Sequence, residues 1–202
     1  DITYTTCYME NSENNELIKN FPIGKKYQII YADPPWQYGF SGTRIEKAKA
    51  DYKVMKTHDI CSIPVKDIAD ENCVLFIWMI WNKLPDCLEV IKSWGFEYKS
   101  CAFTWVKKNH RSGTYFWGMG KWTRQNSEVC LIATKGNPKR ISGGVFSVVD
   151  DAIQRIGIKK INHSSKPSVV RERIVKLCGD IPRIELFARN KYEGWDVWGD
   201  EV

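Results

Sequence analysis

Residues 33–36 of this chain, Asp-Pro-Pro-Trp, place a carboxylate and an indole in a segment that two prolines stiffen. Each proline fixes its own φ and has no amide hydrogen to donate, so the segment cannot continue a strand ladder. The preceding residues 27–32 (YQIIYA) are mostly apolar and rich in β-formers, which predicts a buried strand. We therefore expect the Asp33 carboxylate just beyond the carboxyl end of a strand, where open α/β sheets bind ligands.

This segment suits the methylation of an exocyclic adenine amine. The lone pair of that amine is delocalised into the ring, so the nitrogen is a poor nucleophile. The Asp33 carboxylate and the Pro34 carbonyl can each accept a hydrogen bond from the amine, which favours a tetrahedral nitrogen whose lone pair points at a methyl donor. Trp36, or a nearby aromatic ring, can stack on the base, a contact that contributes roughly 1–3 kcal/mol. The structural alternative is a strand followed by a Pro-Pro turn with a capping Asp.

The elements around this segment alternate between strands and helices. Residues 1–26 are polar and predict an N-terminal arm, whereas residues 27–202 predict a single domain. This alternation predicts an α/β fold with a doubly wound, mostly parallel, Rossmann-like sheet. The predicted strands cover 27–32, 73–81, 96–106, 128–134 and 183–188. The predicted helices cover 84–94 and the segment up to Gly179 that Ser165 can cap.

Residues 107–127 alternate cations with aromatic rings, a combination that nucleic-acid grooves use. Such a long connection is more often functional than not. The alternative is an excursion that buries its own rings. The cations that we expect to contact nucleic acid are Lys107, Lys108, Arg111 and Arg124, and Trp122 is among the rings.

Composition limits the classes of partner and compartment. The formal net charge of +6 fits a polyanionic partner, although basic proteins without one are common. The seven cysteines include no C-x-x-C pair, so we expect reduced thiols and an intracellular protein, in a bacterial cytoplasm or a eukaryotic nucleus. His58 and Cys61 lack a second ligand pair, so no metal site is expected. The longest apolar run, 74–81, is too short to cross a bilayer, so no membrane association is expected.

The DPPW segment resembles the catalytic motif of the MT-A70 adenine-N6 methyltransferases, which use S-adenosylmethionine as methyl donor. The resemblance extends over nearly the whole chain from about Tyr27. It is most similar to the phage and bacterial DNA adenine methyltransferases and to ciliate-type relatives. This family is circularly permuted, with the catalytic motif first and the cofactor strand last, so the absence of a G-x-G loop after the first strand is in keeping with it.

The resemblance also implies roles for individual residues. The catalytic set would be Asp33, Pro34, Pro35 and Trp36. The cofactor-binding set would be Asp33, Lys166, Arg189, Lys191 and Asp200, in which Lys166 of the sequence HSSKP would hold the carboxylate of the methionine moiety. The base would lie near Tyr52 of DYKVM, Trp122 of GKW and the acidic residue Glu128, although Glu128 could equally pair with a nearby Lys or Arg. A lysine beside a helix N-terminus is unfavourable unless an anion binds there, although Lys166 could also be a surface lysine.

These observations together predict methyl transfer from S-adenosylmethionine to N6 of adenine in DNA. The base would be flipped or already single-stranded. Two alternatives remain open at this point, namely N6-adenosine methylation of RNA and a non-catalytic nucleic-acid-binding subunit of a methyltransferase complex. The resemblance also allows a homologous partner subunit or a homodimer.

Overall fold

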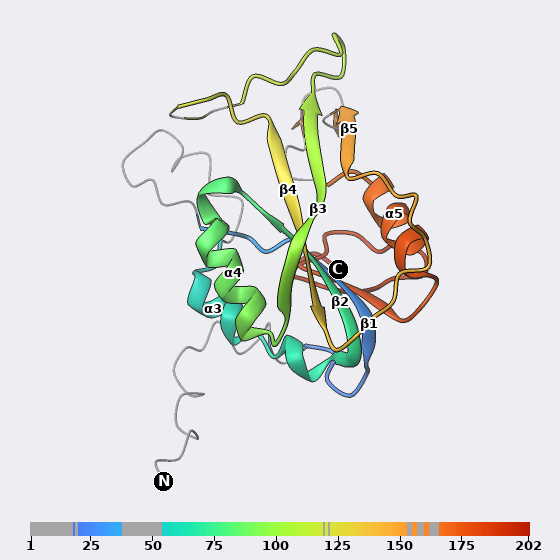
Figure 1. Cartoon of the computed structure of the whole chain (residues 1–202). Coiled ribbons are helices and arrows are strands. Elements are labelled where there is room, and N and C mark those ends of the chain that lie inside the picture. Colours follow the sequence, from blue (N-terminus) through green and yellow to red (C-terminus); the bar gives the residue numbers. More distant parts are fainter. Residues whose placement is uncertain are drawn as a thin grey trace.

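The centre of the protein is a seven-stranded sheet with the order β5-β3-β4-β2-β1-β8-β9 (Figure 1). This computed structural model describes residues 18, 20–37, 54–118, 120, 122–152, 155–156, 160–161 and 166–202. The strands of the sheet are β1 (Tyr27–Ala32), β2 (Ala69–Met79), β3 (Glu97–Lys108), β4 (Ser127–Lys135), β5 (Val148–Ala152), β8 (Arg183–Leu186) and β9 (Asp196–Trp198). A separate pair is formed by β6 (Arg155–Ile156) and β7 (Lys160–Ile161), and the helices are α3 (Thr57–Ser62), η1 (Val65–Asp67), η2 (Trp81–Lys83), α4 (Leu84–Ser93) and α5 (Val169–Cys178).

The seven-stranded sheet is parallel except at β4. Strand β4 runs antiparallel to both of its neighbours, β2 and β3, whereas the other neighbouring strands pair in parallel. The prediction of a mostly parallel α/β sheet is therefore confirmed. The strand expected at 27–32 is β1, which is buried at every position except Gln28.

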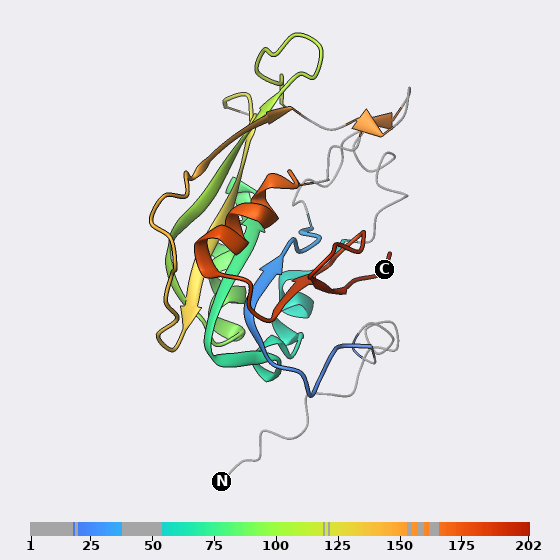
Figure 2. The ribbon, with the colours of Figure 1, turned by 90° about the vertical axis from the view of Figure 1, so that its right-hand side faces the viewer.

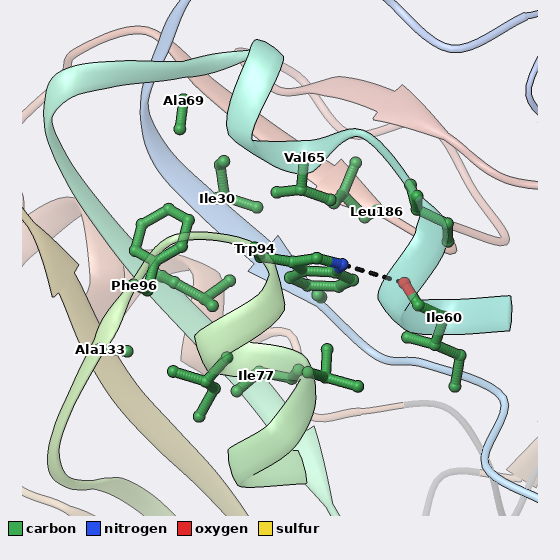
Figure 3. Close-up of a cluster of buried hydrophobic side chains, with 14 of the residues drawn as sticks. Ile30, Ile60, Val65, Ala69, Ile77, Trp94, Phe96, Ala133 and Leu186 are labelled. Carbon is green, nitrogen blue, oxygen red and sulfur yellow. Dashed lines mark hydrogen bonds between the residues drawn. The ribbon is translucent and has the colours of Figure 1, made fainter. Parts of the chain in front are cut away.

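Helices cover both faces of the sheet, as a doubly wound fold requires. Helices α3 and α4 lie on one face and α5 lies on the other (Figures 1 and 2). On the α3/α4 side, Trp94 fills the centre of one core cluster and its indole Nε1 donates a hydrogen bond to the Ile60 carbonyl at 2.9 Å (Figure 3). On the α5 side, Ile29 and Tyr31 of β1 pack with Ile174 in a second cluster. Successive residues of β1 thus serve opposite faces.

Several element bounds differ from those predicted. Strand β2 ends at Met79 because Trp81 already begins a 3₁₀ helix. Strand β8 ends at Leu186, since Phe187 has a positive φ of 61° and turns the chain away from the strand. Helix α5 begins at Val169 with Ser168 as its N-cap, so the expected start near Ser165 is wrong and Ser165 itself lies outside the described residues. Consequently Lys166 lies before the helix, outside any helix or strand.

Three further expectations can be compared with the part of the chain that the structure describes. All six cysteines found there are free thiols. Within the same ranges there is no group of His, Cys, Asp and Glu side chains that could hold a metal ion. Nor does any helix in the described ranges have the length and apolar character to cross a membrane.

The end of the predicted N-terminal arm packs into the core, where the Phe21 ring meets the Trp198 ring edge-on at 5.0 Å.

A buried ion pair fastens α5 to the sheet. Arg171 of α5 donates from Nε to Glu185 Oε2 at 2.6 Å and from Nη2 to Glu185 Oε1 at 2.5 Å, and both side chains are about nine-tenths buried. The guanidinium also lies 3.7 Å from the ring centroid of Tyr192. Burial raises the pKa of Glu185, and the charge of Arg171 opposes that rise.

We predict that Glu185→Gln lowers the free energy of unfolding by about 3–5 kcal/mol, because it leaves the Arg171 charge buried without its partner. Chemical denaturation measures this change. The double variant Arg171→Met/Glu185→Leu removes both charges and should lose less than the single variant. A single-variant loss below about 1 kcal/mol, the value of an exposed pair, would contradict the assignment.

Candidate active site

Asp33 lies at the carboxyl edge of the sheet between two neighbouring strands. The preceding residue, Ala32, pairs with Ile77 of β2 and with Leu186 of β8. The Asp33 amide donates to the Leu186 carbonyl at 3.4 Å, which extends the ladder by one residue before Pro34 ends it. Asp33 therefore lies just beyond the carboxyl end of β1, as the sequence predicted.

The two prolines shape the loop that follows. The Pro34 carbonyl accepts a hydrogen bond from the Trp36 amide at 2.9 Å, and the Pro35 carbonyl accepts one from the Met55 amide at 2.8 Å. A carbonyl oxygen has two lone pairs, so Pro34 retains capacity for one further donor. Backbone hydrogen bonds within the loop and from Met55 thus hold the two residues that directly follow Asp33.

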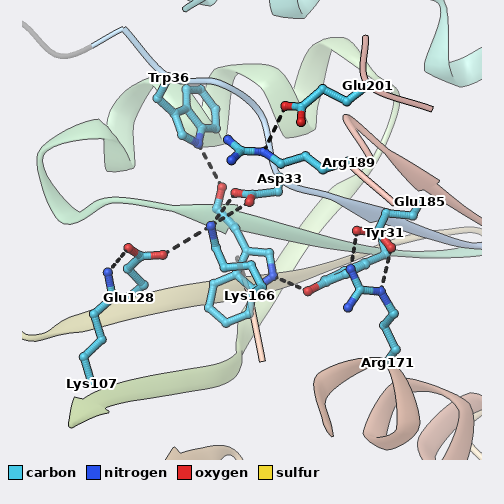
Figure 4. A network of polar contacts seen from close by, with 11 residues as sticks. Tyr31, Asp33, Trp36, Lys107, Glu128, Lys166, Arg171, Glu185, Arg189 and Glu201 are labelled. Carbon is cyan, nitrogen blue, oxygen red and sulfur yellow. Dashed lines mark hydrogen bonds and ion pairs between the residues drawn. The ribbon is translucent and has the colours of Figure 1, made fainter. Parts of the chain in front are cut away.

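The structure corrects the expected role of Trp36. Its side chain is only 6% exposed and belongs to the core cluster on the α3/α4 face. Its indole Nε1 donates to the Trp78 carbonyl at 2.9 Å (Figure 4). A ring enclosed in this way offers no face to a base, so Trp36 anchors the catalytic loop to β2 instead of providing the stacking platform.

Four charged side chains form a continuous chain beside this loop, which we call the charge chain Lys107–Glu128–Lys166–Asp33 (Figure 4). The Lys166 ammonium lies 2.7 Å from Asp33 Oδ1 and 2.6 Å from Oδ2. It also lies 3.3 Å from Glu128 Oε2, while the Lys107 ammonium is bonded to the other oxygen, Oε1. Lysine and carboxylate alternate, so the formal charges of the four groups cancel.

Burial and charge act in opposite directions at these groups. Burial raises the pKa of Asp33, and the charge of Lys166 limits that rise. Burial also works to raise the pKa of Glu128, but Lys166 and Lys107 together outweigh it and hold that pKa below its usual range. Burial works to lower the pKa of Lys166, yet the two carboxylates raise it above the ordinary lysine value. Lys166 therefore stays a cation, and Glu128 stays ionised.

Four different elements contribute to the charge chain. Lys107 lies near the end of β3, and Glu128 lies at the start of β4, where it pairs with Trp105. Asp33 follows β1, and Lys166 precedes α5. The pairing of β3 with β4 brings Lys107 and Glu128 together across 21 positions of sequence, and the return of the chain to α5 brings Lys166 to Asp33 across 133 positions.

The residues expected to bind the cofactor lie at the same edge or near it. Arg189 follows β8 and is close enough to influence the pKa of Asp33, and its Nε lies 3.6 Å from Glu201 Oε1. Lys191 and Asp200 are exposed. Gly199 makes a close approach between the ends of β8 and β9, because a Cβ there would lie 2.3 Å from the Ala188 carbonyl oxygen.

This arrangement fits an S-adenosylmethionine site in the chemistry of its donors. The close approach at Gly199 brings the cation Arg189 and the acceptor Asp200 onto adjoining segments. A cation and an acceptor suit the hydroxyls and the amine of an adenosine, and Lys166 supplies a buried cation for a carboxylate. Roles for these residues in cofactor binding remain proposals.

The residues expected to bind the substrate fall into separate places. Residues 109–126, which we call the hairpin loop, connect β3 to β4 and project beyond the sheet (Figures 1 and 2). Trp117 is 72% exposed and Trp122 is 93% exposed, and the Arg124 guanidinium lies 4.5 Å from the Trp117 ring centroid. The alternative of a loop that buries these rings is therefore wrong for them. Arg111 is exposed as well, whereas Tyr52 lies outside the described residues.

The two lysines at the end of β3 were expected to contact phosphates, and the structure changes that interpretation for Lys107. Its side chain is only 12% exposed, and its charge is balanced by Glu128 inside the site. Lys108 instead pairs at 2.6 Å with Asp150 in a much more exposed position. Because exposed ion pairs are weak, Lys108 can exchange Asp150 for a phosphate at little cost.

Sequence reasoning missed the supporting role of Trp78. This residue was assigned only to a buried strand, yet its ring lies 5.4 Å from the Lys166 ammonium and its carbonyl binds Trp36. Its indole Nε1 donates to the Tyr31 hydroxyl at 2.6 Å, and the Tyr31 ring lies 5.4 Å from the Arg171 guanidinium. The available signal was that a buried Trp needs an acceptor for its N–H.

Comparison with known proteins agrees with this geometry. The family model MT-A70 matches residues 27–201. The chain is 34% identical to the Type II methyltransferase M.MunI of Mycoplasma sp, over 98% of this chain and 88% of that protein. It is 25% identical to the N(6)-adenosine-methyltransferase MT-A70-like protein of Drosophila melanogaster and 26% identical to the N(6)-adenine-specific methyltransferase METTL4 of Mus musculus. Those two alignments cover 88% and 89% of this chain but only 27% and 38% of the longer relatives.

The match extends from the first residue of β1 to the turn after β9, so it includes Asp33, Glu128, Lys166 and Arg189 within one continuous alignment. The chain therefore belongs to the MT-A70 methyltransferase family.

Proposed function

We propose that this protein transfers the methyl group of S-adenosylmethionine to N6 of adenine in DNA. The observation that carries the proposal is the Asp33 carboxylate, which stands beside the Pro34 carbonyl at the carboxyl edge of the sheet and next to the buried cation Lys166. Membership of the MT-A70 family supports the reaction. The preference for DNA is supported by the near full-length similarity to a protein named as a type II methyltransferase.

In the proposed reaction this chain holds the target amine and makes it nucleophilic. An oxygen of Asp33 accepts a hydrogen bond from one N–H, and the Pro34 carbonyl accepts from the other. Two acceptors draw the nitrogen out of conjugation, so that its lone pair points away from the ring. When bound, S-adenosylmethionine supplies an electrophilic methyl group. The methylated nitrogen carries one surplus proton, and the Asp33 oxygen that already accepts from it can take this proton. Most of the acceleration then comes from positioning.

The cofactor is held by cations and acceptors of this chain. We propose that Lys166 and Arg189 bind its anionic and hydroxyl groups and that Asp200 accepts from the adenine amine. Lys191 lies on the same connection as Arg189 and adds a second exposed cation. Asp33 completes this set at the point where donor and target meet.

The hairpin loop provides the surface for the nucleic-acid strand around the target. Exposed rings beside guanidinium groups stack on bases without regard to sequence, and cations contact phosphates. A flipped or unpaired adenine can reach Asp33, whereas a base inside the duplex cannot.

The direct test is methyl transfer by the purified full chain to matched DNA and RNA oligonucleotides, single- and double-stranded, with nucleoside mass spectrometry as the readout. N6-methyladenine in DNA supports the proposal. Product only in RNA would support the same methyl transfer but would make RNA, not DNA, the substrate. Cofactor binding in calorimetry without product would indicate that a partner subunit is required, and the absence of both would favour a non-catalytic subunit.

We predict that Asp33→Asn lowers kcat for methyl transfer by on the order of 10²–10⁴-fold, because the amide has only one acceptor oxygen and cannot take a proton. The fold should remain, since the substitution preserves the size of the side chain. Circular dichroism confirms the fold, and nucleoside mass spectrometry measures the rate. A variant with substantial activity would remove Asp33 from the mechanism.

We predict that Trp122→Ala weakens DNA binding with little effect on kcat at saturating DNA. Loss of one stacked base costs roughly 1–3 kcal/mol, which corresponds to about a 5- to 150-fold increase in Kd. Fluorescence anisotropy with a labelled oligonucleotide measures the change. Phe146→Ala is the matched control, because Phe146 is 82% exposed but lies outside the hairpin loop. Equal Kd values for the two variants would exclude stacking on Trp122.

A further inference from the structure

Lys107 is buried at the point where the hairpin loop leaves the sheet. Its amide donates to the Asn126 carbonyl at 2.8 Å, and its carbonyl accepts from the Phe116 amide at 2.9 Å. Both arms of the loop therefore fix its backbone. Its ammonium lies 4.8 Å from the Trp105 ring centroid and bonds to Glu128 Oε1. The lysine thus points into the site although it belongs to a basic stretch of sequence.

Glu128 divides its two oxygens between two lysines. Oε1 is bonded to Lys107, and Oε2 lies 3.3 Å from the Lys166 ammonium. A carboxylate is planar, so a bond that fixes one oxygen also fixes the direction of the other. Lys107 therefore determines where Oε2 lies relative to Lys166.

Lys166 meets a conflict when the target amine binds. Its ammonium bridges both oxygens of Asp33, at 2.7 and 2.6 Å, and Asp33 is the acceptor that the amine needs. The amine must replace the Lys166 ammonium as hydrogen-bond donor to Asp33. A largely buried ammonium that loses its acceptor is strongly destabilised, because water does not solvate it. Glu128 Oε2 is the carboxylate oxygen already next to Lys166 on the side away from Asp33.

We propose that Lys107 is a positioning residue, which keeps Glu128 ionised and aimed at Lys166 so that Lys166 can shift from Asp33 to Glu128 as the target amine binds. This inference rests on the proposed function, because the incoming donor is the adenine amine. No covalent bond changes in this step. The Lys166 ammonium has three N–H donors, so one can hold the anionic group of the cofactor while another is exchanged between Asp33 and Glu128.

The charges around Glu128 explain why a second lysine is needed. The groups that face it are Lys107 from β3, Lys166 before α5 and Asp33 after β1, and Arg189 lies beyond Asp33. Without Lys107, two carboxylates would share the single ammonium of Lys166. Like charges in a buried site raise the pKa of one partner, so Glu128 would take up a proton more readily. A protonated Glu128 would no longer attract Lys166, which would then stay on Asp33.

The first experiment reads Glu128 directly by NMR of the full chain labelled with ¹³C at the glutamate carboxyl carbons. Glu128→Gln identifies the signal. We expect Glu128 of the wild-type chain to titrate below the usual range of glutamate, and we expect Lys107→Met to raise its pKa by roughly one unit or more. Lys107→Arg should preserve the wild-type titration. Lys99→Met is the matched control, because Lys99 lies on the same strand and pairs at the surface with Glu97.

The second experiment measures kcat and KM for methyl transfer as a function of pH. We expect Lys107→Met to lower kcat by on the order of 10- to 100-fold and to move the acidic limb of the kcat profile to higher pH, while Lys107→Arg and Lys99→Met resemble the wild-type protein. The shift has this sign because Glu128, with its raised pKa, loses its charge at a higher pH.

The results separate three cases. The inference would be overturned if the pKa of Glu128 were the same in Lys107→Met and in the wild-type chain. It would also be overturned if kcat fell only in proportion to a loss of thermal stability, with no change in the pH profile of kcat. If the wild-type chain neither makes N6-methyladenine nor binds the cofactor, the proposed function fails. The NMR titration then still decides whether Lys107 controls Glu128.

Discussion

The contact between the Lys166 ammonium and the Asp33 carboxylate is the constraint on which the site depends. Both groups are largely removed from water, and neither charge would be stable there alone. The two meet because Asp33 directly follows the end of β1 and Lys166 shortly precedes the start of α5. The seven-stranded sheet supplies this geometry, because its centre places the ends of β1, β2 and β8 side by side.

A second polar network supports the contact from the α5 face. Arg171 joins α5 to Glu185 of β8, and its guanidinium lies against Tyr31 of β1. The Tyr31 hydroxyl accepts from Trp78, whose ring in turn lies near Lys166. Aromatic rings thus separate two buried ion pairs that lie on neighbouring strands, and the position of α5 is tied to the position of the catalytic loop. A change in the packing of α5 would therefore reach Lys166 through fixed side chains.

The sequence predicts the parts of this structure that depend on local pattern. Residues 27–32 are β-formers that end at two prolines, so both the strand and the exit of Asp33 follow from short-range chemistry. The burial of Trp36 could not be predicted, because its acceptor is the carbonyl of Trp78, 42 positions away. The pairing of Lys107 could not be predicted either, because its partner Glu128 lies 21 positions away. A run of basic residues has the same sequence pattern whether its lysines contact phosphates or a glutamate inside the protein. Sequence alone also does not show that β4 runs antiparallel.

The hairpin loop and the charge chain are two uses of one basic segment. In residues 107–127 the exposed cations and rings, such as Arg124 and Trp117, are accessible to a polyanion. Lys107 is not, because its ammonium forms an ion pair with Glu128. The division falls just after the end of β3, where half-buried side chains give way to the exposed residues 110–115. The backbone of Lys107 is bonded to both arms of the loop, so the position of the loop and the position of Lys107 are linked through a few residues. In the proposed function, this link couples binding of nucleic acid at the loop to Asp33, the proposed acceptor of the target amine.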